Sequence, residues 1–79
     1  MKLIKAVAMR VSNLLIKNKM SQYALSKKSG LTKQAIANII NEKYDSLKFD
    51  TVIKLADGFD MTFQEFCNDN IFDRDNLDV

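Results

Sequence analysis

The sequence predicts a compact all-α domain of five helices, and three features of the chain support this prediction. The 79 residues contain no proline and only two glycines. Apolar residues recur at helical spacing along most of the chain, whereas the alternating pattern of strands is rare. Serine or threonine precedes three of the apolar segments, as expected for helix N-caps. A chain of this length forms one domain, which buries about 60% of its unfolded-chain surface.

The first two helices are predicted from apolar spacing and from capping residues. Residues 2–18 should form the first helix, since apolar side chains recur there on one face: Leu3, Ile4, Val7, Val11, Leu14 and Leu15. Ser21 is a favourable N-cap for the second helix, and Met20 before it can pack against the first turn. Gly30 should end this helix because glycine adopts the left-handed conformation readily.

A third helix is predicted to begin after the N-cap Thr32 and to run to about Asn41. At about 100° per residue, its isoleucines share one side of the helix. These anchoring residues are Ile36, Ile39 and Ile40. The opposite side, with Lys33 on its flank, carries Gln34, Ala37, Asn38 and Asn41.

The short connection between the second and third helices is the main indication of function. It comprises only Ser29, Gly30 and Leu31. Two short helices joined by a three-residue turn with glycine are typical of a helix-turn-helix, whose second helix enters the major groove of DNA. The outward amides of the third helix suit that groove, because Gln and Asn pair bidentately with adenine and Lys pairs with guanine. Outside this context the same amides indicate only a solvated helix face.

Two further helices are predicted in the second half of the chain. After a loop at residues 41–48, a fourth helix over residues 49–59 is marked by Phe49, Val52, Leu55, Ala56 and Phe59. Asp60 stands where that helix should stop. Thr62 and Glu65 have the spacing of a capping box, which predicts a short fifth helix. That helix presents Phe63, Phe66 and Cys67.

The residue types present exclude several classes of function. With Cys67 as the one cysteine and no histidine, the chain assembles neither an internal disulfide nor a His/Cys zinc site. It has no glycine-rich phosphate loop or nucleophile elbow, so we expect neither an enzyme nor a bound cofactor. The longest apolar runs fall far short of the ~20 residues of a membrane span, and the N-terminus lacks a signal-peptide core. We therefore expect a cytoplasmic protein.

Charge is divided unevenly along the chain, although the net charge is only +2. Residues 1–48 carry ten lysine or arginine residues against Glu42 and Asp45, a net charge of +8. Residues 49–79 carry two basic and eight acidic residues, a net charge of −6. A domain with one basic and one acidic face orients towards a polyanion, which makes nucleic acid the favoured partner. Charge alone leaves open that the lysines only cover solvent-exposed helix faces.

Two segments resemble the helix-turn-helix domains of phage repressors, Cro proteins and XRE-type bacterial regulators. They are MSQYALSKKSGLTKQAIANIINEK and FDTVIKLADGFDMTFQEF, and the resemblance extends from about Val11 to Cys67. Gln22 opens the second helix and Gly30 lies in the turn, as in that family. The resemblance implies a lambda-repressor-like fold, with a DNA-binding domain at residues 1–68 and an acidic tail at residues 69–79.

The resemblance also implies a role for each matching residue. Lys33, Gln34 and Asn38 occupy the recognition-helix positions that meet base edges. The resemblance also implies contacts to the DNA backbone from Gln22, Thr32, Asn41, Lys43 and Lys48. The contact from Lys48 is expected near the minor groove. The implied function is sequence-specific binding of duplex DNA by a small transcriptional repressor.

Six positions depart from the family pattern, and one of them, Ser26, replaces an alanine and is small enough for the close helix contact. Leu15 and Ile40 stand where many members pair an arginine with a glutamate, a replacement that is often neutral or stabilising. Ser29 replaces an apolar residue, which should thin the packing beneath the turn. Glu42 replaces the usual glycine after the recognition helix, and its carboxylate should weaken binding beside a phosphate. Asp60 replaces a glycine at an expected left-handed helix end, where Asp is less well tolerated.

The acidic tail contains apolar residues that are too few to form a core of their own. They either fold back onto the first and fifth helices or form a subunit interface. The second alternative predicts a homodimer that binds two half-sites about 34 Å apart. The expected interface residues are Phe66, Ile71 and Phe72. A competing hypothesis is an antitoxin or another protein-interaction module, in which the tail or the acidic face binds a partner protein and DNA binding is secondary.

Overall fold

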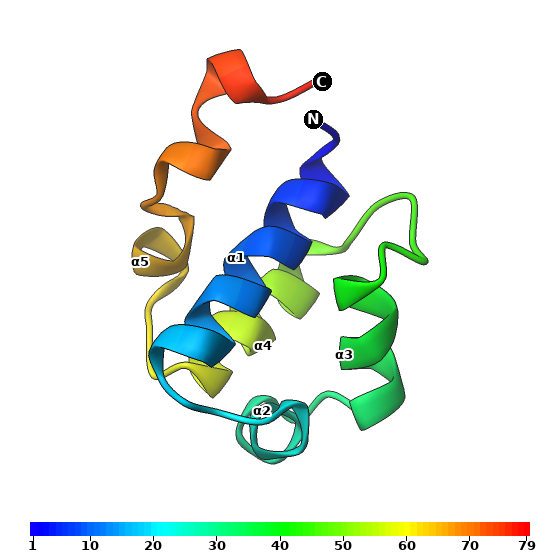
Figure 1. Ribbon diagram of the computed structural model, residues 1–79, viewed down its shortest axis with the longest axis vertical. Helices are drawn as coiled ribbons and strands as arrows, with labels where there is room; N and C mark the ends of the chain where they lie inside the picture. The colour runs from blue at the N-terminus through cyan, green and yellow to red at the C-terminus, as the bar shows by residue number, and fades with distance from the viewer.

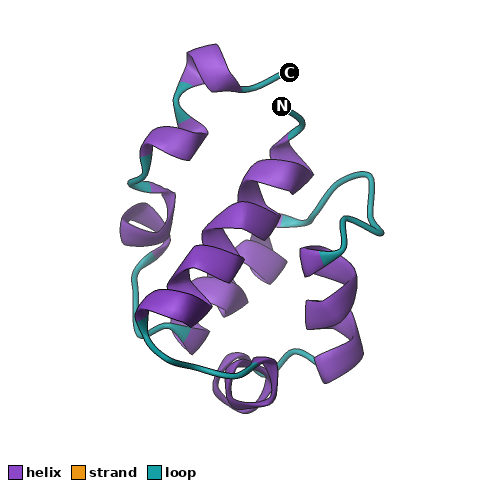
Figure 2. Ribbon diagram, viewed as in Figure 1, coloured by secondary structure: helices purple, strands orange, loops and turns teal.

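The computed structural model describes all 79 residues and contains five α-helices and no strand (Figure 1). The α-helices are α1 (Leu3–Lys17), α2 (Gln22–Ser29), α3 (Lys33–Ile40), α4 (Phe49–Gly58) and α5 (Phe63–Cys67). Figure 2 shows two further helical turns in the tail, the 3-10 helices η1 (Asn70–Phe72) and η2 (Arg74–Asn76). The predicted all-α fold of five helices is confirmed. No helix of this fold has both the length and the apolar character that a membrane crossing requires.

Three helices begin at the side-chain caps that the sequence predicts. The hydroxyl oxygens of Ser21, Thr32 and Thr62 each accept a hydrogen bond from the backbone N–H three residues later, at 3.0–3.1 Å. The Thr62 N–H donates in return to the Glu65 carboxylate at 2.8 Å, which completes the capping box before α5. These bonds give partners to N–H groups that a helix start otherwise leaves free.

Three helices end at a left-handed residue that is not glycine. Lys19 after α1, Glu42 after α3 and Asp60 after α4 have φ angles of 51°, 55° and 57°. Gly30 ends α2 with a φ of 79°. The left-handed conformation costs a residue with a Cβ roughly 1–2 kcal/mol, whereas glycine adopts it freely. The ends of α1, α3 and α4 therefore retain strain that glycine would remove.

The hydrophobic core lies around α1 and α4, and all five α-helices contribute to it. Its largest fully buried side chains are Phe66, Leu25, Ile36, Ile39, Leu55 and Val11. In Figure 1, α1 runs through the middle of the molecule with α4 behind it, α3 lies on one side, α5 lies on the other and α2 closes one end. Leu15 and Ile40 are half-buried against this core. Apolar packing therefore occupies the two positions where many members of the family that the sequence resembles pair an arginine with a glutamate.

Gly58 allows α2 to approach α4 closely. A Cβ at this position would lie 2.5 Å from Leu25 Cδ1 and 3.0 Å from Ser29 Cβ, closer than packed carbon atoms approach. Leu25 has no exposed surface. The absence of a side chain at Gly58 therefore sets the depth at which α2 packs on α4, and α2 in turn carries the connection to α3.

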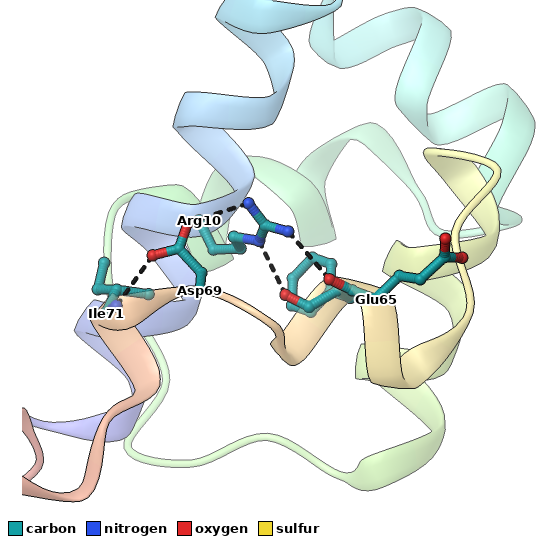
Figure 3. A network of polar contacts seen from close by, with 5 residues as sticks. Arg10, Glu65, Asp69 and Ile71 are labelled. Atoms are coloured by element: carbon teal, nitrogen blue, oxygen red, sulfur yellow. Dashed lines mark hydrogen bonds and ion pairs between the residues drawn. The ribbon is translucent and has the colours of Figure 1, made fainter.

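Arg10 of α1 joins α5 and the tail to the rest of the domain (Figure 3). Its guanidinium donates to the carbonyls of Glu65 and Phe66, at 3.1 and 2.8 Å, and to the carboxylate of Asp69 at 3.1 Å. The second oxygen of Asp69 accepts the Ile71 N–H at 2.9 Å and so begins η1. The Phe66 carbonyl thereby gains a partner that the helix does not provide, and the Glu65 carbonyl gains a second donor beside the Asn68 N–H.

The tail lies against α1 within the single chain. η1 packs on α1, and the Phe72 ring lies 6.1 Å from the Phe66 ring, measured between ring centres. The Asp78 N–H donates to the Met1 carbonyl at 2.8 Å, so the two ends of the chain lie close together, as Figure 1 shows. Part of the tail's apolar surface is thus covered by the domain that precedes it.

Candidate nucleic-acid interface

Local hydrogen bonds close the turn between α2 and α3. The Gly30 N–H donates to the Ser26 carbonyl and the Leu31 N–H donates to the Ser29 hydroxyl, both at 3.1 Å. Ser29 is buried, with 7% of its surface exposed. Its hydroxyl therefore stabilises the turn at a position where the family that the sequence resembles commonly has an apolar residue.

α3 has one buried side and one exposed side. Ile36 and Ile39 have 0% and 1% of their surface exposed and hold the helix on the core. Ile40 is half-buried at the edge of the same side. Gln34 and Asn38 lie on the opposite side, where Gln34 is exposed and Asn38 is half-buried, and Lys33 is exposed on the flank of the first turn. All three predicted base-reading residues thus keep surface that the core does not cover.

A row of hydrogen-bonded side chains runs along the exposed side of α3. The Gln34 Nε2 amide donates to Asn38 Oδ1 at 2.9 Å, one helical turn away. The Asn38 Nδ2 amide donates to the Tyr44 hydroxyl oxygen at 3.3 Å. Sequence reasoning identified Gln34 and Asn38 but missed Tyr44. The available signal was a tyrosine among polar residues in the loop that directly follows the proposed recognition helix.

The end of α3 folds the chain back so that Tyr44 reaches this row. The Glu42 N–H donates to the Ile39 carbonyl at 3.1 Å, and the Lys43 N–H donates to the Asn38 carbonyl at 2.8 Å. Together with the left-handed Glu42, these bonds form a Schellman motif. Asn38 therefore makes two hydrogen bonds to the loop after α3. Its carbonyl accepts the Lys43 N–H, and its side-chain amide donates to the Tyr44 hydroxyl.

The five predicted backbone-contact residues lie at helix ends or next to them. Gln22 is the first residue of α2, Lys43 follows the left-handed end of α3, and Lys48 is the N-cap residue of α4. Asn41 is exposed directly after α3. The Thr32 hydroxyl accepts the Ala35 N–H, which leaves its own hydrogen free to donate to an acceptor such as a phosphate.

The exposed lysines of this surface have no acidic partners. None of Lys33, Lys43 and Lys48 forms an ion pair, whereas Lys28 on α2 is paired with Asp60. The chain contains no acidic residue before Glu42, which is exposed at the end of α3. The surface around α3 is therefore basic and available to a polyanion, with Glu42 as the one carboxylate directly after the helix.

Cys67 lies away from this surface and has the character of a packing residue. Its side chain is half-buried against the core at the end of α5. Burial raises the pKa of the thiol, and the charge of Arg10 opposes this rise only in part. A raised pKa disfavours the thiolate, the form that reacts in redox chemistry. No three His, Cys, Asp or Glu side chains gather in a geometry that could hold a metal ion.

The three residues expected at a dimer interface have different surroundings. Phe66 has no exposed surface, because it packs in the core beneath Arg10, so its assignment to a subunit interface is wrong. Ile71 and Phe72 are half-buried and keep part of their surface free. Phe72 also lines an apolar groove of about 630 Å³, and residues of α1, α4 and α5 form most of the rest of its wall. The exposed apolar residues along it are Leu3, Phe49 and Val79, and Phe63 is half-buried there.

The fold and this surface define a helix-turn-helix domain, in which α2 and α3 are joined by the short turn at Gly30. The chain belongs to the family of Cro/C1-type HTH DNA-binding domains, whose model matches residues 10–70. The matched segment begins within α1 and ends at the first residue of η1. Comparison with curated proteins and with solved structures gave no match. Membership of this family makes the protein a DNA-binding protein, and such domains are typically not enzymes.

Proposed function

We propose that this protein is a transcriptional repressor that binds a specific duplex DNA site by inserting α3 into the major groove. The observation that carries this proposal is the outward row of Gln34, which is exposed, and Asn38, which is half-buried, beside the unpaired Lys33. Each amide offers a donor and an acceptor to adenine N7 and N6, and lysine suits the acceptors of guanine. A helix face that only needed solubility would gain as much from charged side chains.

Contacts to the phosphates complete the binding mode. Lys43 and Lys48 supply positive charge, and the free hydrogen of the Thr32 hydroxyl and the amides of Gln22 and Asn41 supply donors. These contacts fix the orientation of the domain on the duplex and carry no sequence information directly. They make affinity strongly dependent on salt, because each neutralised phosphate releases counterions.

Repression is the simplest regulatory outcome of this binding mode. A domain that occupies an operator excludes polymerase from the same duplex by its volume alone and needs no further contact. An activator requires a second surface that touches the transcription machinery. The site of action is the cytoplasm, where an unenclosed bacterial or phage genome lies.

Selection of bound sites from random duplexes tests this function directly. A defined motif with adenine or guanine at two or three neighbouring positions is expected, since Lys33, Gln34 and Asn38 cover about one and a half turns of helix. Transcription in vitro from a promoter overlapping the selected motif should fall as protein is added. Recovery of duplexes without any common motif would refute sequence-specific reading, and rising transcription would refute repression.

We further propose that two copies bind two half-sites as a homodimer through the groove that Phe72 lines. Its support is the exposure of apolar side chains along it, with 77% of the surface of Phe49 and 48% of that of Leu3 exposed. The Phe49 ring meets the Phe63 ring edge-on at 5.9 Å between ring centres. Contiguous exposed apolar surface of this kind marks interaction sites in soluble proteins.

The dimer is tested by sedimentation equilibrium at micromolar to high micromolar concentration. Phe49→Ala should shift the protein towards the monomer, because it removes the most exposed ring along the groove. Ile16→Ala is the matched control, since Ile16 is also 77% exposed but does not line the groove. A monomeric wild-type chain at high micromolar concentration, or equal dimerisation of both variants, would refute this interface.

A further inference from the structure

Tyr44 ends the hydrogen-bonded row on α3 and has no other polar partner. Its hydroxyl oxygen accepts the Asn38 amide at 3.3 Å, and the hydroxyl hydrogen donates to no atom of the protein. Tyr44 has 36% of its surface exposed and bonds Asn38 on the outward side of α3, so a ligand of α3 can reach its hydroxyl. The row therefore has one free donor at its end.

We propose that Tyr44 is a positioning residue that sets the orientation of the two reading amides, Asn38 and Gln34, when its hydroxyl donates to a DNA phosphate. This inference rests on the proposed function of α3 in reading DNA. It assigns to Tyr44 a role in specificity, which acts through Asn38, in addition to any contribution to affinity. The ligand group is a phosphate oxygen of the duplex backbone.

The hydrogen bonds of the row can run in either of two directions, depending on which group donates at each step. This choice explains how a phosphate can influence base reading. A side-chain amide has two donors on nitrogen and two lone pairs on oxygen, and a tyrosine hydroxyl can donate or accept. In the opposite direction, Tyr44 would donate to the Asn38 oxygen and Asn38 would donate to the Gln34 oxygen. Both directions satisfy the row in the free protein. They present different atoms of Asn38 and Gln34 to the groove.

A phosphate selects one of these two directions because its oxygens accept hydrogen bonds and donate none. When the Tyr44 hydrogen is given to phosphate, only a lone pair of the hydroxyl remains for Asn38. The Asn38 nitrogen must then face Tyr44, and its oxygen must face the Gln34 nitrogen, as in the structure. In this direction Asn38 keeps one N–H and one lone pair free, and Gln34 keeps one N–H and both lone pairs of its oxygen, so each can still offer adenine a donor and an acceptor.

The backbone of α3's end holds Tyr44 in place for this role. The Lys43 N–H donates to the Asn38 carbonyl at 2.8 Å, so the residue before Tyr44 is tied to the same residue that Tyr44 orients. The left-handed Glu42 makes this return possible. The hydroxyl is thus fixed relative to Asn38 by a main-chain bond as well as by its own bond.

The experiment compares Tyr44→Phe with wild-type protein on the selected site and on sites with one base changed. Tyr44→Phe should reduce the preference for the selected base three- to tenfold at the position read by Asn38, the effect of about one hydrogen bond. In an Asn38→Ala background the same substitution should change base preference no further, because the hydroxyl acts through Asn38. Tyr23→Phe is the matched control, since the Tyr23 hydroxyl joins no hydrogen bond, and it should leave base preference unchanged.

The possible outcomes separate this inference from the proposed function. If wild-type protein shows no base preference, both the proposed function and the inference fail. If wild-type protein selects a motif and Tyr44→Phe weakens all sequences equally, Tyr44 only contacts the backbone and the inference fails alone. The thermal midpoint of Tyr44→Phe, expected within a few degrees of wild type, excludes loss of folding as the cause of lost preference.

Discussion

Two hydrogen-bonded networks of similar size perform different tasks in this domain. Around Arg10, a guanidinium with 12% of its side chain exposed donates from all three nitrogens to protein acceptors. Along α3, the amides of Gln34 and Asn38 use only part of their hydrogen-bonding capacity and lie towards solvent. A network whose donors are all bonded within the protein stabilises the fold. A network that keeps free donors and acceptors on a basic surface can bind a ligand.

The difference predicts that Arg10 acts on stability alone. Arg10→Met keeps an extended side chain but removes the guanidinium bonds to the carbonyls of Glu65 and Phe66 and to the Asp69 carboxylate, and of these only the Phe66 carbonyl loses its one donor. Hydrogen bonds to a charged donor contribute roughly 1.5–3 kcal/mol each, and the partial exposure of Asp69 lowers the sum. The free energy of unfolding should fall by about 2–4 kcal/mol, measured as a lower urea midpoint with an unchanged slope.

Lys27→Met is the matched control for Arg10→Met. Lys27 lies over the Tyr23 ring at 5.3 Å and Arg10 over the Phe66 ring at 5.8 Å, so both variants lose a cation above an aromatic ring. An exposed pair of this kind contributes about 0.5–1 kcal/mol. A loss below about 1 kcal/mol in both variants would show that the Arg10 hydrogen bonds do not hold the tail and α5.

Gln34→Ala should have the next largest effect, on DNA binding and not on folding. Removal of this exposed amide should cost roughly 1–3 kcal/mol of binding free energy at one operator position and relax the base preference there. Lys43→Ala should weaken all sequences alike and reduce the salt slope by about one. Titrations of both variants against matched and single-substituted sites distinguish the two effects. A uniform loss from both variants would show that Gln34 does not read a base.

Glu42→Gly should strengthen both stability and DNA binding, by smaller amounts. Glycine removes the strain of a left-handed residue but loses more conformational freedom on folding, so the gain in stability should be about 0.5–1 kcal/mol. Removal of the one carboxylate at the end of α3 should also tighten DNA binding by roughly threefold at low salt.

Asp60→Gly controls for the stability part of the Glu42 prediction. Asp60 is also an acidic residue at a left-handed helix end, with a φ of 57°, but it follows α4. This variant should gain stability without a gain in DNA affinity, as judged by urea unfolding and by DNA titration. Equal gains in affinity for the two variants would mean that only the net charge of the protein matters, not the position of Glu42.

The parts of the fold that sequence reasoning predicted are those governed by neighbouring residues. Ser21, Thr32 and Thr62 act within one helical turn, so their patterns are visible in the sequence. The contacts of Arg10 join residues more than fifty positions apart, and no local pattern marks them. Phe66 was misassigned because an apolar residue near an acidic tail does not reveal whether its own chain covers it.

In the candidate site, too, the features set by neighbouring residues were predicted and those set by the path of the chain were not. The outward position of Gln34 follows from helical periodicity alone, because the isoleucines fix which side of α3 is buried. Tyr44 joins the site only because the left-handed Glu42 turns the chain back towards Asn38. That conformation is rare for glutamate, so local propensity argues against it. Residues brought to a site by a strained helix end are thus the hardest to predict from sequence.

The smallest expected effect concerns the ion pair between Lys28 and Asp60, which links α2 to the end of α4. The side chains are 41% and 75% exposed, compared with 12% and 35% for Arg10 and Asp69. An exposed pair gains little, because water screens the charges and two long side chains lose freedom. Lys28→Ala should therefore lower the free energy of unfolding by less than about 0.5 kcal/mol in urea titrations. A loss comparable to that of Arg10→Met would mean that burial does not separate the two ion pairs, and that the approach of α2 to α4 depends on charge as well as on Gly58.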